Sequence, residues 1–274
     1  AAAALPVSAA STRTIAGADT ILRWAHIGAA RAALQRNDKP KAIEHARQVS
    51  GMGTTNDFEF RVYFNESTAL NIFNFYANRL SGGAGVTTGS VSGTNYIGLD
   101  DARVPHPLTA TGTPQAEVAT GGSFVVPNSG ASFSSFNGTK TGADFTFSGW
   151  IRIASLLEAR YILAEAEGAT AEHIAFVESR RTAFPSSTTP TPVDATNFMA
   201  SLREQRRRDF YLDGHRFGDL RRYERQQGID LWPAGPFYGS TTIQFGTQKC
   251  WPLTLAEATN NPMVPKPYTP PTGP

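Results

Sequence analysis

The stretch "QRRRDFYLDGHRFGDLRRY" spans residues 205–223 and lies within a longer run, 202–226, that holds eight arginines and five carboxylates. Asp209 and Asp213 stand four residues apart, one turn of a helix, with arginines on either side. A helix that binds nucleic acid keeps its arginine side free of carboxylates. The mixture of charges therefore favours a structural helix whose charges pair with one another, and it argues against a nucleic-acid partner.

The whole chain sets further limits. It has 274 residues, of which 40% are hydrophobic, enough to bury a core of ordinary size. The formal charge of +2 creates no strong field for a polyanion or an anionic membrane. Cys250 is the one cysteine, so the chain has no intramolecular disulfide and no site built from two thiols. These features are those of a globular protein whose fold depends on packing.

Helical spacing recurs on both sides of "RNDKP", residues 36–40. The predicted apolar faces are Ile21, Leu22, Ala25, Ala29, Ala32 and Ala33 in the first helix, and Ala42, Ile43, Ala46 and Val49 in the second. Together they predict a helical hairpin over 18–50 that resembles one tetratricopeptide repeat (TPR). Since one such repeat cannot bury its face alone, other parts of the chain should cover it.

The rest of the chain divides into segments of different composition and apolar spacing. Residues 51–149 are rich in Gly, Ser and Thr around short aromatic pieces such as "FEFRVYF", which predicts a loop-rich region with few short strands. Helical spacing returns near 150–167, where Ser148 can cap the start, and near 197–213. We expect these two helices to pack against each other. The sequence thus predicts a mainly α single domain over 1–274, with its C-terminal helices and a closing loop in 150–265.

Several stretches resemble segments of the SusD/RagB family. Residues 205–223 are similar to the family's helix of the type ERRREL-x-x-EGHR-x-x-DLRR. Other SusD-like segments, in the family's order, are "NESTALNIFNF", "LDDARVP", "IRIASLLEARYILAEAEG" and "KCWPLTLAEATNNP". The chain departs from the pattern at Gln205, Asp209 and Asp213, where the family usually has glutamate. It resembles the C-terminal portion of a family member.

The resemblance implies a cell-surface protein that binds a glycan or another nutrient and catalyses no reaction. It implies a place at the outer membrane, with a lipid anchor on residues upstream of this chain. It also implies a SusC-like TonB-dependent transporter as the partner that receives the oligosaccharide, and neither a cofactor nor a metal. Two other functions stay open: a helical-repeat adaptor between proteins, and an unrecognised glycoside hydrolase.

Sugar binding requires aromatic rings that lie against pyranose faces and polar groups that bond the hydroxyls, and loops commonly present both. The candidate ligand-binding residues in two loop regions are Tyr63, Asn65, Tyr76, Asn95 and Tyr96, and then Trp232, Phe237 and Tyr238. Core packing is the competing interpretation for each ring. In the arginine-rich run we expect a structural role for Arg206, Asp209, Asp213 and Arg216.

Overall fold

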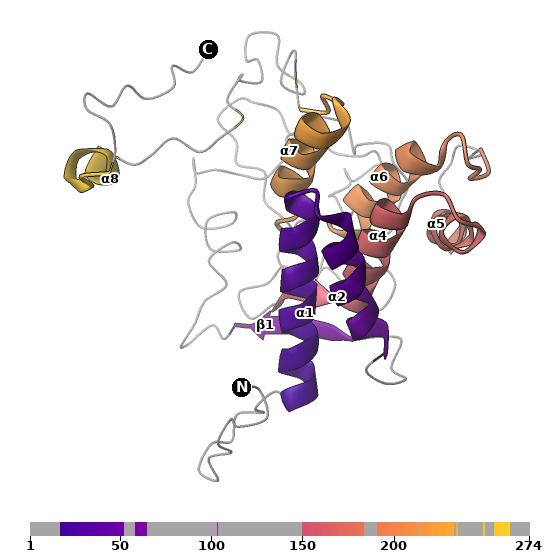
Figure 1. Ribbon diagram of the computed structural model, residues 1–274, viewed down its shortest axis with the longest axis horizontal. Helices are drawn as coiled ribbons and strands as arrows, with labels where there is room; N and C mark the ends of the chain where they lie inside the picture. The colour runs from indigo at the N-terminus through magenta and orange to yellow at the C-terminus, as the bar shows by residue number, and fades with distance from the viewer. Residues whose placement is uncertain are drawn as a thin grey trace, which may run out of the picture.

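The computed structural model is mainly helical (Figure 1). It describes residues 17–51, 58–64, 103, 150–183, 191–211, 213–232, 234, 249 and 255–263. The helices are α1 (Ala18–Gln35), α2 (Lys39–Gly51), α4 (Leu156–Glu167), α5 (Ala171–Ala183), α6 (Phe198–Asp209), α7 (Arg216–Gln227) and α8 (Leu255–Asn260). The strands are β1 (Glu59–Tyr63) and β2 (Trp150–Ser155). The mainly α fold with few short strands is as the sequence predicts, whereas most of 51–149 lies outside the described residues.

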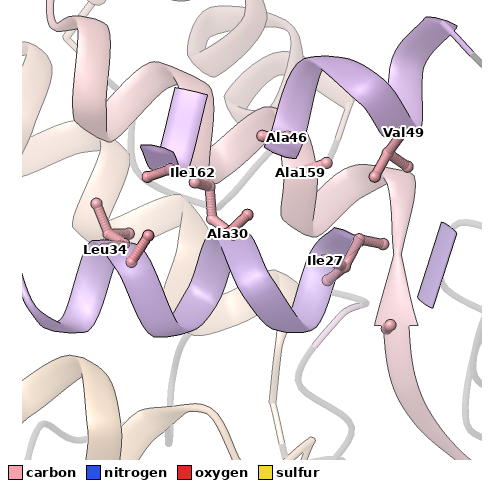
Figure 2. Packing of buried hydrophobic residues seen from close by; sticks show 10 residues of the cluster. Ile27, Ala30, Leu34, Ala46, Val49, Ala159 and Ile162 are labelled. Carbon is pink, nitrogen blue, oxygen red and sulfur yellow. The ribbon is translucent and has the colours of Figure 1, made fainter. Parts of the chain in front are cut away.

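The predicted hairpin over 18–50 is present as α1 and α2, which lie side by side with α4 against them (Figure 1). Asp38 begins the second helix by accepting the backbone N–H of Lys41 at 3.3 Å. The core between the three helices is built of alanines with a few larger aliphatic side chains (Figure 2). Its buried members on these helices are Ile27, Ala30, Ala33, Leu34, Ala42, Ala46, Val49, Ala159 and Ile162.

The predicted apolar face of α2 is confirmed at Ala42, Ala46 and Val49, with Ile43 partly buried, whereas that of α1 is confirmed only at Ala33. Leu22 is exposed, and the buried stripe of α1 runs through Ile27 and Leu34. Alanines occur all around this helix, so their spacing alone does not select one face. The large aliphatic side chains do select the buried face, because their burial removes the most apolar surface from water.

Residues 150–155 form a strand, although the sequence predicts a helix over 150–167. The strand β2 pairs antiparallel with β1, so that Tyr63 faces Trp150, with an irregularity between Phe60 and Arg61. Helix α4 then begins at Leu156. Its cap is Ser155, in place of the expected Ser148, and the Ser155 Oγ accepts the backbone N–H of Glu158 at 3.2 Å. Residues 151–154 form a strand despite their helical spacing, because β1 supplies hydrogen-bonding partners that are distant in sequence.

A second core joins α4, α5 and α6, which confirms the expected contact between the helices near 150–167 and 197–213. Tyr161 of α4 lies edge-on to Phe176 and Phe210, with ring centroids 5.0 and 5.5 Å apart. Phe198 and Leu202 of α6 are buried in the same cluster. The arginine-bearing helix is therefore attached to α4 by apolar packing as well as by charge.

The arginine-rich run is two helices, not one. Helix α6 ends at Asp209, short of the predicted 213, and α7 begins at Arg216. Gly214 between them has φ +78°, a left-handed conformation that residues other than glycine adopt only with strain. The break lets the two helices present their arginines in different directions. Among the described residues, no helix combines the length and apolar content that crossing a bilayer requires.

Candidate functional site

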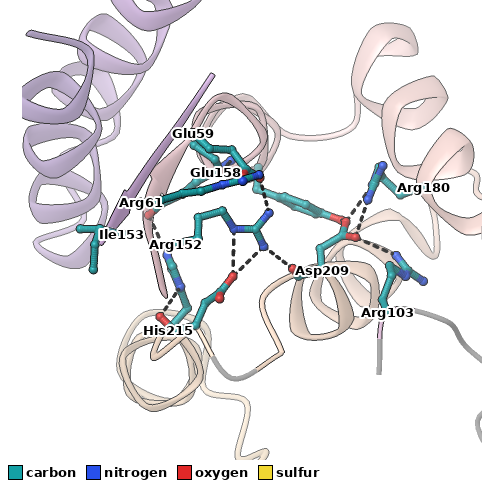
Figure 3. A network of polar contacts seen from close by, with 12 residues as sticks. Glu59, Arg61, Arg103, Arg152, Ile153, Glu158, Arg180, Asp209 and His215 are labelled. Atoms are coloured by element: carbon teal, nitrogen blue, oxygen red, sulfur yellow. Dashed lines mark hydrogen bonds and ion pairs between the residues drawn. The ribbon is translucent and has the colours of Figure 1, made fainter. Parts of the chain in front are cut away.

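A buried ion network surrounds Asp209, at the end of α6 (Figure 3). Arg180 of α5 donates from Nη2 to Oδ1 at 2.5 Å and from Nε to Oδ2 at 2.8 Å. Arg103 donates to Oδ1 at 3.1 Å, and the hydroxyl of Tyr161 donates to Oδ2 at 2.5 Å. Burial alone would raise the pKa of Asp209, but Arg180 and Arg103 outweigh it and lower that pKa. The carboxylate is therefore ionised and fully engaged.

Two neighbouring pairs extend the network. Arg152 of β2 donates to Asp213 from Nε at 3.0 Å and from Nη2 at 2.6 Å, and Nη1 lies 3.0 Å from Glu59 of β1. In the other pair, Arg206 Nε donates to Asp219 Oδ2 at 2.8 Å. These contacts join α6 to the sheet and to α7.

A last buried arginine, Arg222 of α7, completes the network. It donates to Glu165 from Nε and Nη2, both at 2.8 Å, and its Nη1 lies 2.9 Å from Asp219. Arg216, the first residue of α7, is partly buried. The carboxylates of Asp209, Asp213 and Asp219 are thus all paired with arginines inside the protein, which is how buried charges are commonly accommodated.

Sequence reasoning named Arg206, Asp209 and Asp213 but not their partners. Those partners are Arg103, Arg152, Arg180 and Asp219, and all but Arg180 lie in stretches already quoted for their family resemblance. A charged residue inside an otherwise apolar segment is the one signal that points to a buried pair. The spacing could not say which carboxylate each arginine meets.

An open groove lies where the end of α1 approaches α7. It has a volume of about 750 Å³ and lies between residues 35–37 and one side of α7, residues 217–226. We call it the arginine groove, because Arg36, Arg221 and Arg225 line it and are exposed. Beneath them lies Arg222, whose charge is already balanced inside the buried network.

The walls of the groove are joined by hydrogen bonds. Gln226 Nε2 donates to the carbonyl oxygens of Leu34 and Gln35, both at 2.9 Å, and so satisfies the C-terminal end of α1. Gln35 Nε2 donates in return to the carbonyl of Gly218 at 3.2 Å. A side chain at Gly218 would crowd that amide, since an added Cβ would lie 3.2 Å from it. The close approach of α7 to α1 holds the groove in shape.

Trp232 lies beside the groove, on the segment that folds back after α7. Its ring packs edge-on against Phe217, a groove residue, with centroids 5.4 Å apart. Its Nε1 donates to Glu224 at 2.8 Å, and Lys249 Nζ lies 2.6 Å from the same carboxylate. The ring is partly buried and is anchored to α7, so it neither fills the core nor projects freely.

Of the other predicted ligand residues, the structure describes Tyr63, which does not lie with Trp232. Tyr63 ends β1 and is 68% exposed. Close to that strand, Trp24 near the start of α1 stacks on Phe60 with centroids 4.5 Å apart. This surface is thus near the beginning of α1, whereas the groove is at its end. Outside the described residues lie Asn65, Tyr76, Asn95, Tyr96, Phe237 and Tyr238.

Within the described ranges, no three His, Cys, Asp or Glu side chains gather closely enough to hold a metal ion. No protein-family model matches the chain, and no curated protein does. Among solved structures, the chain is similar to a SusD-like carbohydrate-binding protein from Bacteroides fragilis, with 13% identity and a TM-score of 0.42. The similarity covers 76% of this chain and 52% of that one, so the chain spans about half the length of that protein.

Proposed function

We propose that the protein is a cell-surface glycan-binding protein that captures oligosaccharides and passes them to a TonB-dependent transporter of the outer membrane. The observation that carries the binding step is the open groove flanked by Phe217 and Trp232. Aromatic faces, guanidinium groups and amides there offer the apolar and polar contacts that sugars use. The transporter, the lipid anchor and the location rest on the resemblance of the sequence motifs to SusD/RagB proteins.

The geometry weighs against a glycoside hydrolase among the described residues. A general acid for glycoside cleavage needs a carboxyl group whose pKa is raised. Here burial is outweighed by ion pairs, and the pKa of Glu158 falls to about 2 through His215 and Arg31. The pKa values of Asp209 and Asp219 are lowered by their arginines in the same way. Such groups stay ionised and cannot donate a proton at neutral pH.

A protein–protein adaptor is the other alternative. Repeat adaptors bind partners along the concave surface of several stacked repeats. In the described part of the chain, α1 and α2 form a hairpin of that type, but α4, which covers it, is preceded by a strand and not by a second helix of a repeat. The hairpin therefore serves as one wall of a mixed scaffold.

The binding proposal predicts that Trp232→Ala weakens oligosaccharide affinity by roughly 5- to 30-fold, because one stacked ring contributes on the order of 1–2 kcal/mol through buried apolar surface. Calorimetric titration with oligosaccharides from several polysaccharides measures this, with a thermal melt of each variant. Trp24→Ala is the matched control, since that ring is also partly exposed but lies near the other end of α1.

Unchanged affinity in folded Trp232→Ala would exclude this surface, and loss in Tyr63→Ala would place the site at β1 instead. A parent protein that binds no glycan, or that releases reducing ends from one, would contradict the proposed function itself.

A further inference from the structure

We propose that the ligand of the arginine groove is an acidic oligosaccharide, one that carries uronic-acid carboxylates along its chain. This rests on the proposed glycan-binding function and adds the chemical class of the glycan. The exposed arginines of the groove differ from the buried, ion-paired arginines of the same run.

At least four of the eight arginines of α6 and α7 have carboxylate partners. Arg206 pairs with Asp219, Arg222 pairs with Glu165, and Arg207 and Arg208 both pair with Glu204. Arg221 and Arg225 lie in the same run, but neither forms an ion pair with a described residue. The interpretation of the whole run as salt-bridged is therefore wrong for these two positions.

The third exposed guanidinium belongs to Arg36, which the chain brings in from the turn after α1. It too forms no ion pair within the described part of the chain. The nearest acidic neighbours in sequence have other contacts: Asp38 accepts the N–H of Lys41, and Glu224 is held by Lys249 and Trp232. Three cations thus line one groove with no counter-charge from these carboxylates.

Their arrangement suits a ligand with repeated negative charges. Arg221 and Arg225 are one helical turn apart, about 6 Å along the axis of α7. Arg36 lines the same groove from the turn after α1. Guanidinium groups bind carboxylates through paired N–H donors, and charge-assisted bonds of this kind are about twice as strong as neutral ones.

The groove also offers hydrogen-bond acceptors. The amide nitrogens of Gln35 and Gln226 are used on backbone carbonyls, which leaves their Oε1 atoms to accept hydrogen bonds. Asn37 adds a third exposed amide in the groove wall. A free phosphate at neutral pH mainly accepts hydrogen bonds, so it would leave the amide oxygens of the groove unused. A uronate sugar presents carboxylates to the arginines and hydroxyl donors to these amide oxygens.

Phe217 gives the groove an apolar element, with Trp232 behind it. A sugar ring can place its CH surface on such a side chain. A nucleic acid would need a longer basic track, since its affinity comes from many neutralised phosphates, and the chain carries a net charge of only +2. An oligosaccharide with a few carboxylates matches three cations better.

The test compares uronate oligosaccharides, built from galacturonate, mannuronate or glucuronate, with the same molecules after reduction of each carboxyl group to an alcohol. Calorimetric titration should show at least tenfold tighter binding of one acidic member over its reduced form. Arg221→Gln/Arg225→Gln should lower the affinity for the acidic form much more than that for the reduced form, and so remove most of that preference. Arg225→Gln alone should cost roughly tenfold, the loss of one charge-assisted contact.

Arg47→Gln is the charge-matched control for Arg225→Gln. Arg47 is an exposed arginine of α2 that pairs with Glu167, away from the groove, so removing it should leave binding unchanged. The acidic-glycan inference is overturned if the reduced oligosaccharides bind as well as the acidic ones, and the glycan-binding function then survives. Binding of neither form overturns both. Preferential binding of a single-stranded oligonucleotide or of polyglutamate at physiological salt would assign the groove to another class of partner.

Discussion

Asp209→Ala will lower the free energy of unfolding by about 3–5 kcal/mol, the loss expected when one partner of a buried ion pair is removed. The carboxylate accepts from Arg103, Arg180 and Tyr161, so the substitution leaves a buried cation, a partly buried cation and a buried hydroxyl without this acceptor. Urea denaturation of the parent and the variant, followed by far-ultraviolet circular dichroism, measures the difference.

Glu204→Ala is the matched control for Asp209→Ala. Glu204 lies on the same helix and also meets two arginines, but its side chain is partly exposed. Pairs of that kind contribute about 1 kcal/mol or less. Equal losses in the two variants would contradict the distinction between a buried network and a solvated helix face.

The second large effect is acid unfolding. The pKa of Glu158 is lowered to about 2, and those of Asp209 and Asp219 are lowered as well, so the unfolded chain binds more protons than the folded one in acid. The stability that these groups add is therefore complete above about pH 4.5 and is lost as the pH falls toward 2. Glu158 alone accounts for roughly 3 kcal/mol of that loss.

Denaturation curves recorded between pH 7 and pH 2.5 test this expectation. Glu158→Gln should flatten the pH dependence, because the amide cannot be protonated in this range. Its Arg31 partner is partly exposed and can be hydrated in the variant. Stability that stayed level from pH 6 to pH 3 would show that these carboxylates are not held ionised by the network.

The parts of the fold that the sequence predicts are those set by local pattern. The hairpin over 18–50 follows from helical spacing on both sides of a turn, and the contact between α4 and α6 follows from two apolar faces. The strand at 150–155 could not be predicted, since its partner β1 is nearly ninety residues away in sequence. The break at Gly214 could not be located either, because the same run holds a second glycine, Gly218, which lies inside α7.

The candidate site shows the same division. Ring chemistry and a Gly/Pro-rich segment singled out Trp232, whose role in binding stays a prediction. Composition could not separate Arg221 and Arg225 from Arg206 and Arg222, because all four lie in one charged run. Their environments differ only in the folded protein, where Arg206 pairs with Asp219 and Arg222 pairs with Glu165. The end of α1 also lies against α7 there. Tertiary contacts, and not spacing, decide which arginines remain available.

We infer that one arginine-rich run serves two purposes, as a buried scaffold and as an exposed binding surface. The most direct measurement is a nuclear magnetic resonance titration of the arginine Nε–H signals with a uronate oligosaccharide. The signals of Arg36, Arg221 and Arg225 should shift, while those of Arg152 and Arg206, which are buried, ion-paired and outside the groove lining, stay in place. Shifts confined to the buried set, or no shift under conditions where calorimetry records binding, would contradict this division.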